Sequence, residues 1–189
     1  MTPFSVSTSG KAMSRRRRAA AAIVRFLRSE GGGPAAEFAL VAAPFFGLML
    51  AMLQVGLIYF AQQSLETAVE ESARLVLTGQ VQNANMTQSQ FATAVCNNSP
   101  GLFTCANFMI DLQPAASFAN ANVSMPTLTF DANGNVTNTW QYNPGTPGDI
   151  MVMRVMYQWP VFLAPGLNLA SLSNGALLLM STAVFRNEP

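Results

Sequence analysis

The pattern of hydrophobic and polar residues contains one long apolar run. Residues 38–60 comprise 23 residues without a charged side chain. As a helix they extend about 34 Å, enough to cross the roughly 30 Å hydrocarbon core of a bilayer. The run is also longer than the apolar core of an ordinary secretory signal peptide, which has about 7–15 residues. The pattern therefore predicts a transmembrane helix at residues 38–60.

The apolar pattern then changes but keeps a helical period. Small or apolar residues recur at a spacing of three and four positions, which is typical of a helix with one apolar stripe. They are Ala61, Leu65, Ala68, Val69, Ser72, Leu75 and Val76. Gly79 is a typical stop at a helix C-terminus. One long helix is therefore expected over residues 33–79, its first half in lipid and its second half outside.

From residue 80 onward Asn, Thr, Ser, Pro and Gly become frequent, and the apolar runs become short. Thr87 is a suitable cap for a short helix at residues 88–96. Strand-like runs follow, and residues 131–135 carry a hairpin signal between two of them. The runs are residues 108–113, 123–130, 136–142, 150–159 and 176–185. The predicted fold class is α+β, a long helix leading into a small antiparallel β-sheet domain at residues 80–189.

Charge separates the two ends of the chain. Residues 1–32 hold seven basic and one acidic residue, a net charge of +6, and the remainder has a net charge of −5. The four arginines at 15–18 could bind nucleic acid or form a localisation signal. Because an apolar span follows so closely, a cytoplasmic leader obeying the positive-inside rule is favoured, with no nucleic-acid partner. This orientation exports residues 80–189 into the periplasm.

Cys96 and Cys105 are the two cysteines of the chain. In a reducing compartment they would be two small buried thiols, and outside the cytoplasm a disulfide is expected. The predicted export therefore favours the disulfide. Closing so short a loop would stabilise the fold by about 2–3 kcal/mol in the chain-entropy account.

The composition argues against an enzyme. The chain has no histidine, which excludes Ser-His-Asp and Cys-His sites and the HExxH zinc motif. Two cysteines cannot form a Cys₄ metal site, and the glycines at 31–33 fit no nucleotide-binding motif. Asp111, Asp131 and Asp149 lack the spacing of a calcium loop. We therefore expect no metal, no cofactor and no small-molecule substrate.

The segment around the start of the apolar run resembles a known processing site. A basic leader precedes Gly32, and then comes GPAAEFALVA, which begins at Gly33 and contains Glu37. This arrangement resembles the start of type IV pilins and pseudopilins. More narrowly, PAAEFALVAAPFFGLMLAMLQVGLIYF and LETAVEESARLVLTG are similar to TadE-like proteins of the tight-adherence (Tad/Flp) pilus system. The closing STAVFRNEP also resembles the end of the longer members.

The resemblance implies a processing and assembly pathway. A prepilin peptidase of the membrane would cut between Gly32 and Gly33, although the triple glycine leaves the bond open within residues 31–33. Glu37 would become the fifth residue of the processed chain and pair with the free amine of a neighbouring subunit. The implied partners are the inner membrane, other pilins or pseudopilins and the Tad secretion machinery. The large domain after the helix favours a minor pilin or pseudopilin over the bulk fibre subunit.

Two other interpretations remain open from the sequence. The chain could be a single-pass envelope protein with a binding or sensory domain outside the membrane, unrelated to pili. Glu37 would then be only a helix-end charge, stabilised by the helix dipole. A secreted hydrolase with an uncleaved anchor is the third possibility, and the absence of histidine argues against it.

Overall fold

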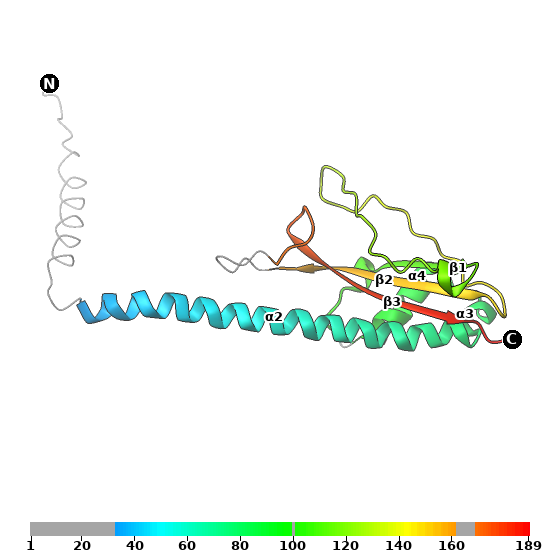
Figure 1. The fold of residues 1–189 in the computed structure, drawn as a ribbon, viewed down its shortest axis with the longest axis horizontal. Helices are drawn as coiled ribbons and strands as arrows, with labels where there is room; N and C mark the ends of the chain where they lie inside the picture. The colour runs from blue at the N-terminus through cyan, green and yellow to red at the C-terminus, as the bar shows by residue number, and fades with distance from the viewer. Residues whose placement is uncertain (1–32, 100, 162–168) are drawn as a thin grey trace, which may run out of the picture. The chain divides into compact units, whose positions relative to one another are not determined.

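The computed structural model describes residues 33–99, 101–161 and 169–189, and it separates into two compact units, Met1–Met49 and Leu50–Pro189. The predicted leader at residues 1–32, including Gly32, lies outside the described residues. A long helix is followed by a small antiparallel sheet, which confirms the α+β class. Figure 1 shows these elements with the labels used below.

Helix α2 runs from Gly33 to Leu77 and contains 45 residues. It continues through Pro44, whose missing N–H is tolerated as a single gap in the hydrogen-bond ladder. Gly79 has a φ of 73° and its N–H donates to the carbonyl of Val76 over 3.0 Å. This left-handed residue is the predicted stop, because glycine adopts a positive φ without steric cost.

Two short helices follow, α3 at Gln80–Asn83 and α4 at Gln88–Asn97. The predicted cap of α4 is confirmed as a capping box. Thr87 Oγ1 accepts from the N–H of Gln90 at 3.3 Å, and Gln90 Oε1 accepts from the N–H of Thr87 at 2.8 Å. Two orphan donors at the helix start are thereby satisfied. Short 3₁₀ helices lie at Cys105–Asn107 and Phe118–Asn120.

The sheet of the described residues has three antiparallel strands in the order β1-β2-β3. They are β1 at Met109–Ala115, β2 at Ile150–Pro160 and β3 at Ala176–Arg186. Three of the five predicted runs are therefore strands, and β2, which contains the mostly apolar run 150–159, is the central strand. Asp111 of β1 lies opposite Arg154 of β2, which in turn lies opposite Thr182 of β3.

The other two runs, residues 123–130 and 136–142, are not strands, and this prediction was wrong. The turn between them does form, held by bonds from the N–H groups of Asn133 and Asn135 to Asp131 Oδ1. The two runs share a single isolated β-bridge, between Phe130 and Val136, and their other contacts include hydrogen bonds made by side chains. Asn138 Oδ1 accepts from the N–H of Thr129, and Asn138 Nδ2 donates to the carbonyl of Thr127. Such side-chain bonds compete with regular strand pairing.

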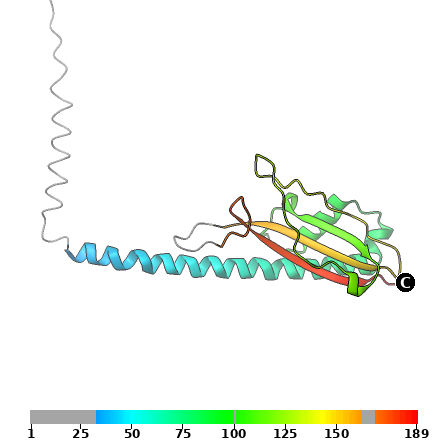
Figure 2. The same cartoon turned by 45° about the horizontal axis from the view of Figure 1, so that its top comes forward.

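One face of the sheet packs against the second half of α2 and against α4. In Figures 1 and 2 the strands follow this part of the helix in both views. The interface is the main hydrophobic core and draws on alternate residues of β2, as the pleat of a strand requires. Its members include Leu65, Val69, Val76, Phe91, Val95, Ile110, Leu112, Met151, Met153, Val155 and Tyr157.

The opposite face of the sheet is covered by the long segment between β1 and β2. Leu128 of this segment forms a second small core with Met109, Met156 and Leu178. Trp140 is half-buried against the same cluster. Met151, Met153 and Met156 are all fully buried, where their flexible side chains fill irregular gaps in the two cores.

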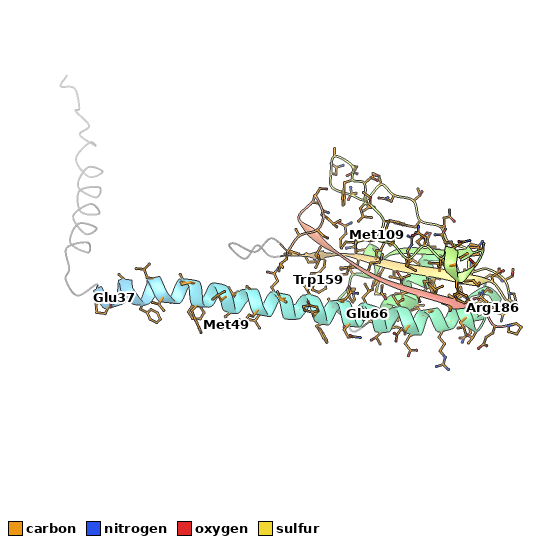
Figure 3. All side chains as sticks on the ribbon, in the orientation of Figure 1. Glu37, Met49, Glu66, Met109, Trp159 and Arg186 are labelled. Atoms are coloured by element: carbon orange, nitrogen blue, oxygen red, sulfur yellow. A yellow bond between two sulfur atoms is a disulfide. The ribbon has the colours of Figure 1, made fainter. Side chains whose placement is uncertain are left out.

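The C-terminal residues return to the end of α2. The N–H of Glu188 donates to the carbonyl of Leu77 over 2.9 Å. Asn187 is buried, and its Nδ2 donates to the carbonyl oxygens of Pro144 and Thr146. These bonds fasten the end of β3 beside the end of α2, where Figure 3 labels Arg186.

Candidate functional site: the apolar segment of helix α2

The residues 38–60 of α2, which we call the apolar segment, expose large hydrophobic side chains on every side of the helix. Phe38 is 72% exposed and Phe60 is 55% exposed. The exposed members are Phe38, Leu40, Val41, Phe45, Phe46, Leu48, Met49, Leu50, Met52, Leu53, Leu57, Tyr59 and Phe60. Burying one such side chain stabilises by about 1.5–3 kcal/mol. The described residues leave most of these side chains uncovered, so the segment is suited to an apolar environment.

Helix α2 is long and apolar enough to cross a membrane, and it is the one such helix among the described residues. Only a small share of its most apolar stretch is buried inside the protein. A core helix of a soluble domain would be mostly covered by its own chain. The predicted span thus agrees with the structure in helical state, length and exposure.

The predicted processing and pairing residues lie at the start of α2. Gly33 is the first residue of the helix, and open space surrounds the position where a Cβ would stand. The Glu37 side chain is exposed and has no ion pair or hydrogen bond with any residue that the structure describes. Figure 3 labels Glu37 at this end of the helix. A carboxylate in this place interacts favourably with the helix dipole and is free to accept a partner.

Cys96 and Cys105 are joined by a disulfide, with their Cα atoms 5.3 Å apart. Cys96 lies in the last turn of α4 and Cys105 begins a 3₁₀ helix. The bond closes the loop that carries Phe103 into the main core. Phe103 packs edge-to-face on Tyr157 with ring centroids 4.9 Å apart. The disulfide is therefore structural and holds α4 to the sheet.

The sequence did not predict the buried ion pair of Asp111 with Arg154. Arg154 Nε donates to Asp111 Oδ2 over 3.0 Å, and Nη2 donates to the same oxygen. Arg154 Nη1 also donates to the carbonyl of Ser124, and Asp111 Oδ1 accepts from the N–H of Gln141. The pair thus fastens both ends of the segment covering the outer face. The sequence feature that could have indicated this pair is Arg154, the one charged residue in the mostly apolar run 150–159.

The other carboxylates of the domain hold turns. Thr146 donates to Asp149 Oδ2 from its N–H at 2.7 Å and from its hydroxyl at 2.8 Å, which lowers the pKa of Asp149. The side chain and N–H of Asn135 similarly lower the pKa of Asp131. Tyr142 donates to the carbonyl of Met86, and burial raises its pKa to about 12. Each group is explained by local structure.

Little in the described part of the chain offers a site for chemistry. No group of three His, Cys, Asp or Glu residues there could hold a metal ion. Two open hollows of about 480 and 430 Å³ lie beside Phe108. No charged side chain lines either of them, and Cys105, at the edge of the larger hollow, is already disulfide-bonded. Among the described residues, the apolar segment is therefore the strongest candidate for a functional surface.

A comparison with protein families supports the importance of this helix. The sequence model of the family described as TadE-like protein matches residues 32–74. The match begins one residue before α2 and includes Gly33, Glu37 and the whole apolar segment. It confirms the resemblance of this segment to TadE-like proteins that was seen in the sequence. Neither the curated proteins nor the solved structures contain a match to the chain.

Proposed function

We propose that the chain is a pseudopilin or minor pilin that takes part in assembly of a Tad-type pilus for surface adhesion. It is inserted once in the bacterial inner membrane, with residues 1–32 in the cytoplasm and the sheet domain in the periplasm. One observation carries the proposal. The family match falls on a helix that begins at Gly33 and exposes many large apolar side chains, and its Glu37 has no partner among the described residues.

Processing creates the partner that Glu37 lacks. A prepilin peptidase cuts between Gly32 and Gly33 and frees an amine at the new N-terminus, beside the lipid boundary. A charge at that boundary is costly unless it is paired. The Glu37 carboxylate of one subunit and the amine of its neighbour therefore attract each other as the neighbour enters the filament. This pairing sets the register between adjacent helices.

Packing of the apolar segments then holds the subunits together. Helices in an apolar environment associate through close van der Waals contact, which small residues permit. Ala43 and Gly47 are one helical turn apart on a part of the helix that the described residues leave uncovered, and open space surrounds the position of a Cβ on Gly47. A neighbouring helix can approach closely there. The larger side chains around this contact fill the remaining space.

The sheet domain is a structural module in this proposal and carries no enzymatic activity. Its disulfide and its buried ion pair make a domain suited to a compartment where it meets other pilus components. Contacts with other pilins and with the Tad machinery are made by this domain and by α2. The direct partners are open to experiment.

The test replaces Glu37 in the native host and separates processing from assembly. In Glu37→Ala the unpaired amine costs about 2–3 kcal/mol or more near lipid, so piliation should fail. The processed protein should still accumulate, since the cleaved bond is several residues away. Glu37→Asp should be partly defective, and Glu37→Gln should behave nearer to alanine. An immunoblot of the processed form and a count of pili by electron microscopy are the measurements.

Glu70→Ala is the matched control, because Glu70 is an exposed acid of the same helix outside the apolar segment. It should leave piliation unchanged. Normal piliation with Glu37→Ala would reduce Glu37 to a helix-end charge and remove the pairing mechanism. N-terminal sequencing that finds Met1 or Thr2 in a peptidase-positive host would refute processing. The protein would then be a single-pass envelope protein.

A further inference from the structure

Two hydrogen bonds determine how β3 lies along helix α2. At the far end, the N–H of Glu188 donates to the carbonyl of Leu77. Nearer the membrane span, Gln62 Nε2 donates to the carbonyl of Met180 over 3.0 Å. From the bond of Gln62 with Met180 to the bond of Leu77 with Glu188, residue numbers increase along both parts of the chain. Strand β3 therefore runs alongside α2 and parallel to it, with Ala176 at the end nearest the apolar segment.

The sheet reaches past the end of the predicted span. Ala176 precedes Met180 by four strand residues, about 13 Å, and that length corresponds to about nine helical residues. The end of the sheet thus lies level with a helix position near Gln54. The helix shows the same overlap. Ala51 is only 6% exposed and the Gln54 amide nitrogen is buried, whereas Met52 between them is 73% exposed.

This end of the sheet is uncharged, and its apolar residues lie beside one polar pair, in which Asn174 Nδ2 donates to Gln158 Oε1 over 2.7 Å. We call it the apolar sheet end and define it by Trp159, Pro160, Val161, Ala176 and Leu177. Every residue from 155 to 185 is uncharged. Trp159 packs at 5.9 Å between ring centroids on Phe103 and at 6.4 Å on Tyr157. Trp and Tyr of this kind are enriched where a protein meets the boundary between lipid headgroups and acyl chains.

We propose that the apolar sheet end is a second membrane contact, lying at the headgroup–acyl boundary of the bilayer that α2 crosses. On the other side of the helix, Met52, Leu53 and Leu57 expose apolar side chains at the same level. A bilayer that covers these residues also reaches the apolar sheet end. The inference rests on the membrane anchoring in the proposed function and is independent of pilus assembly.

The length of the helix is compatible with this depth. A hydrocarbon core of about 30 Å that begins at Phe38, directly after Glu37, takes up about 20 helical residues and ends near Leu57. The helix position near Gln54, which lies level with the apolar sheet end, is therefore close to the outer boundary of that core. The domain rests in the membrane surface and does not stand on an exposed stalk. Tyr59 and Phe60 are aromatic residues suited to the same boundary.

Tryptophan fluorescence in vesicles tests the contact. The full chain is reconstituted in phosphatidylethanolamine and phosphatidylglycerol vesicles that contain lipids with brominated acyl chains. Trp140→Phe leaves Trp159 as the one tryptophan, and Trp159→Phe leaves Trp140. Through the bridge of Leu112 with Tyr142, Trp140 lies level with Val155, about 13 Å farther from the membrane. Bromine should quench Trp159 at least threefold more strongly than Trp140.

A charge variant sharpens the result. Pro160→Glu places a carboxylate on the exposed edge of the apolar sheet end, and Thr139→Glu places one on an exposed residue beside Trp140. In the Trp140→Phe background, Pro160→Glu should lower the quenching of Trp159 about twofold or more. Thr139→Glu should leave it unchanged. The near-ultraviolet circular dichroism of each variant shows whether the domain is folded.

Three outcomes would overturn the inference. Equal, weak quenching of both tryptophans in a chain that floats with the vesicles would place the apolar sheet end in water. If the quenching of Trp159 by bromine decreases as the protein-to-lipid ratio increases, a second copy of the chain covers this surface in place of lipid. A chain that fails to float with vesicles would refute the membrane anchoring of the proposed function as well, which distinguishes the two failures.

Discussion

Two leucines of helix α2 show how differently the two halves of this molecule are stabilised. Leu57 in the apolar segment is 55% exposed, and Leu65 in the second half is fully buried. They lie about two turns apart in the same regular helix. Leu65 packs in the core formed with β1, β2 and α4, whereas Leu57 is not a member of that core. Helical structure alone therefore does not determine what an apolar residue does.

The polar residues repeat the contrast. In the sheet domain, Asp111 and Arg154 are buried and satisfy each other and the covering segment. In the apolar half, Glu37 is exposed and has no partner among the described residues. The domain pairs these two charges internally, whereas in the proposed function Glu37 pairs with another subunit. The following experiments probe this difference.

The largest expected effect is at the buried ion pair. Asp111→Ala leaves Arg154 buried and uncompensated, which should lower the free energy of unfolding of the domain by about 3–5 kcal/mol. Replacing both residues, as Asp111→Leu with Arg154→Met, should cost clearly less, because no buried charge remains. Urea unfolding of the full chain in a mild detergent, followed by tryptophan fluorescence, is the measurement. If Asp111→Ala lowers the free energy of unfolding by less than about 1 kcal/mol, water reaches the Arg154 guanidinium and replaces its lost partner.

The two leucines give the next comparison. Leu65→Ala should lower the free energy of unfolding by about 2–5 kcal/mol, because it opens a cavity in the main core. Leu57→Ala serves as the matched variant and should change the stability of the domain by less than about 1 kcal/mol. The same urea experiment in detergent measures both. Equal losses would mean that the apolar segment belongs to the folded core of the domain.

Removing the disulfide should have a smaller effect. Cys96→Ser with Cys105→Ser should cost about 2–3 kcal/mol, because the unfolded chain regains the freedom of the closed loop. A reducing agent should destabilise the wild-type domain and leave the double variant unchanged. Mass spectrometry of a non-reduced digest should show the two peptides linked. Two free, alkylatable thiols in protein taken from the envelope would contradict the proposed export.

The smallest effect concerns acid stability. The donors of Thr146 lower the pKa of Asp149 in the folded state, so its contribution is present above the unfolded pKa, about 3.9. The contribution is lost as the pH falls through the folded pKa. The thermal midpoint should therefore fall less steeply below about pH 4 in Asp149→Asn than in wild type. Asp131→Asn removes the other carboxylate whose pKa is lowered by its turn, and it should flatten the acid profile in the same way. Parallel acid profiles for Asp149→Asn and wild type would refute the assignment.

The sequence by itself determined the elements whose cause is local. A continuous apolar run, a three-and-four spacing and Gly79 set the limits of α2 to within about two residues. Thr87 marked the start of α4, and strand-like runs marked β1, β2 and β3. The start of α2 with Gly33 and Glu37 was also visible, because the processing motif is a short contiguous segment. Its cleavage and its pairing remain predictions.

The tertiary structure alone decided what depends on distant parts of the chain. Residues 123–130 and 136–142 have strand-like patterns, yet side chains such as Asn138 replace their ladder. Asp111 and Arg154 are 43 positions apart, and only the register of β1 and β2 brings them together. The bond from Gln62 to Met180 likewise sets how far β3 reaches along α2. Local patterns encode backbone conformation, whereas burial and charge pairing depend on which segments meet in space.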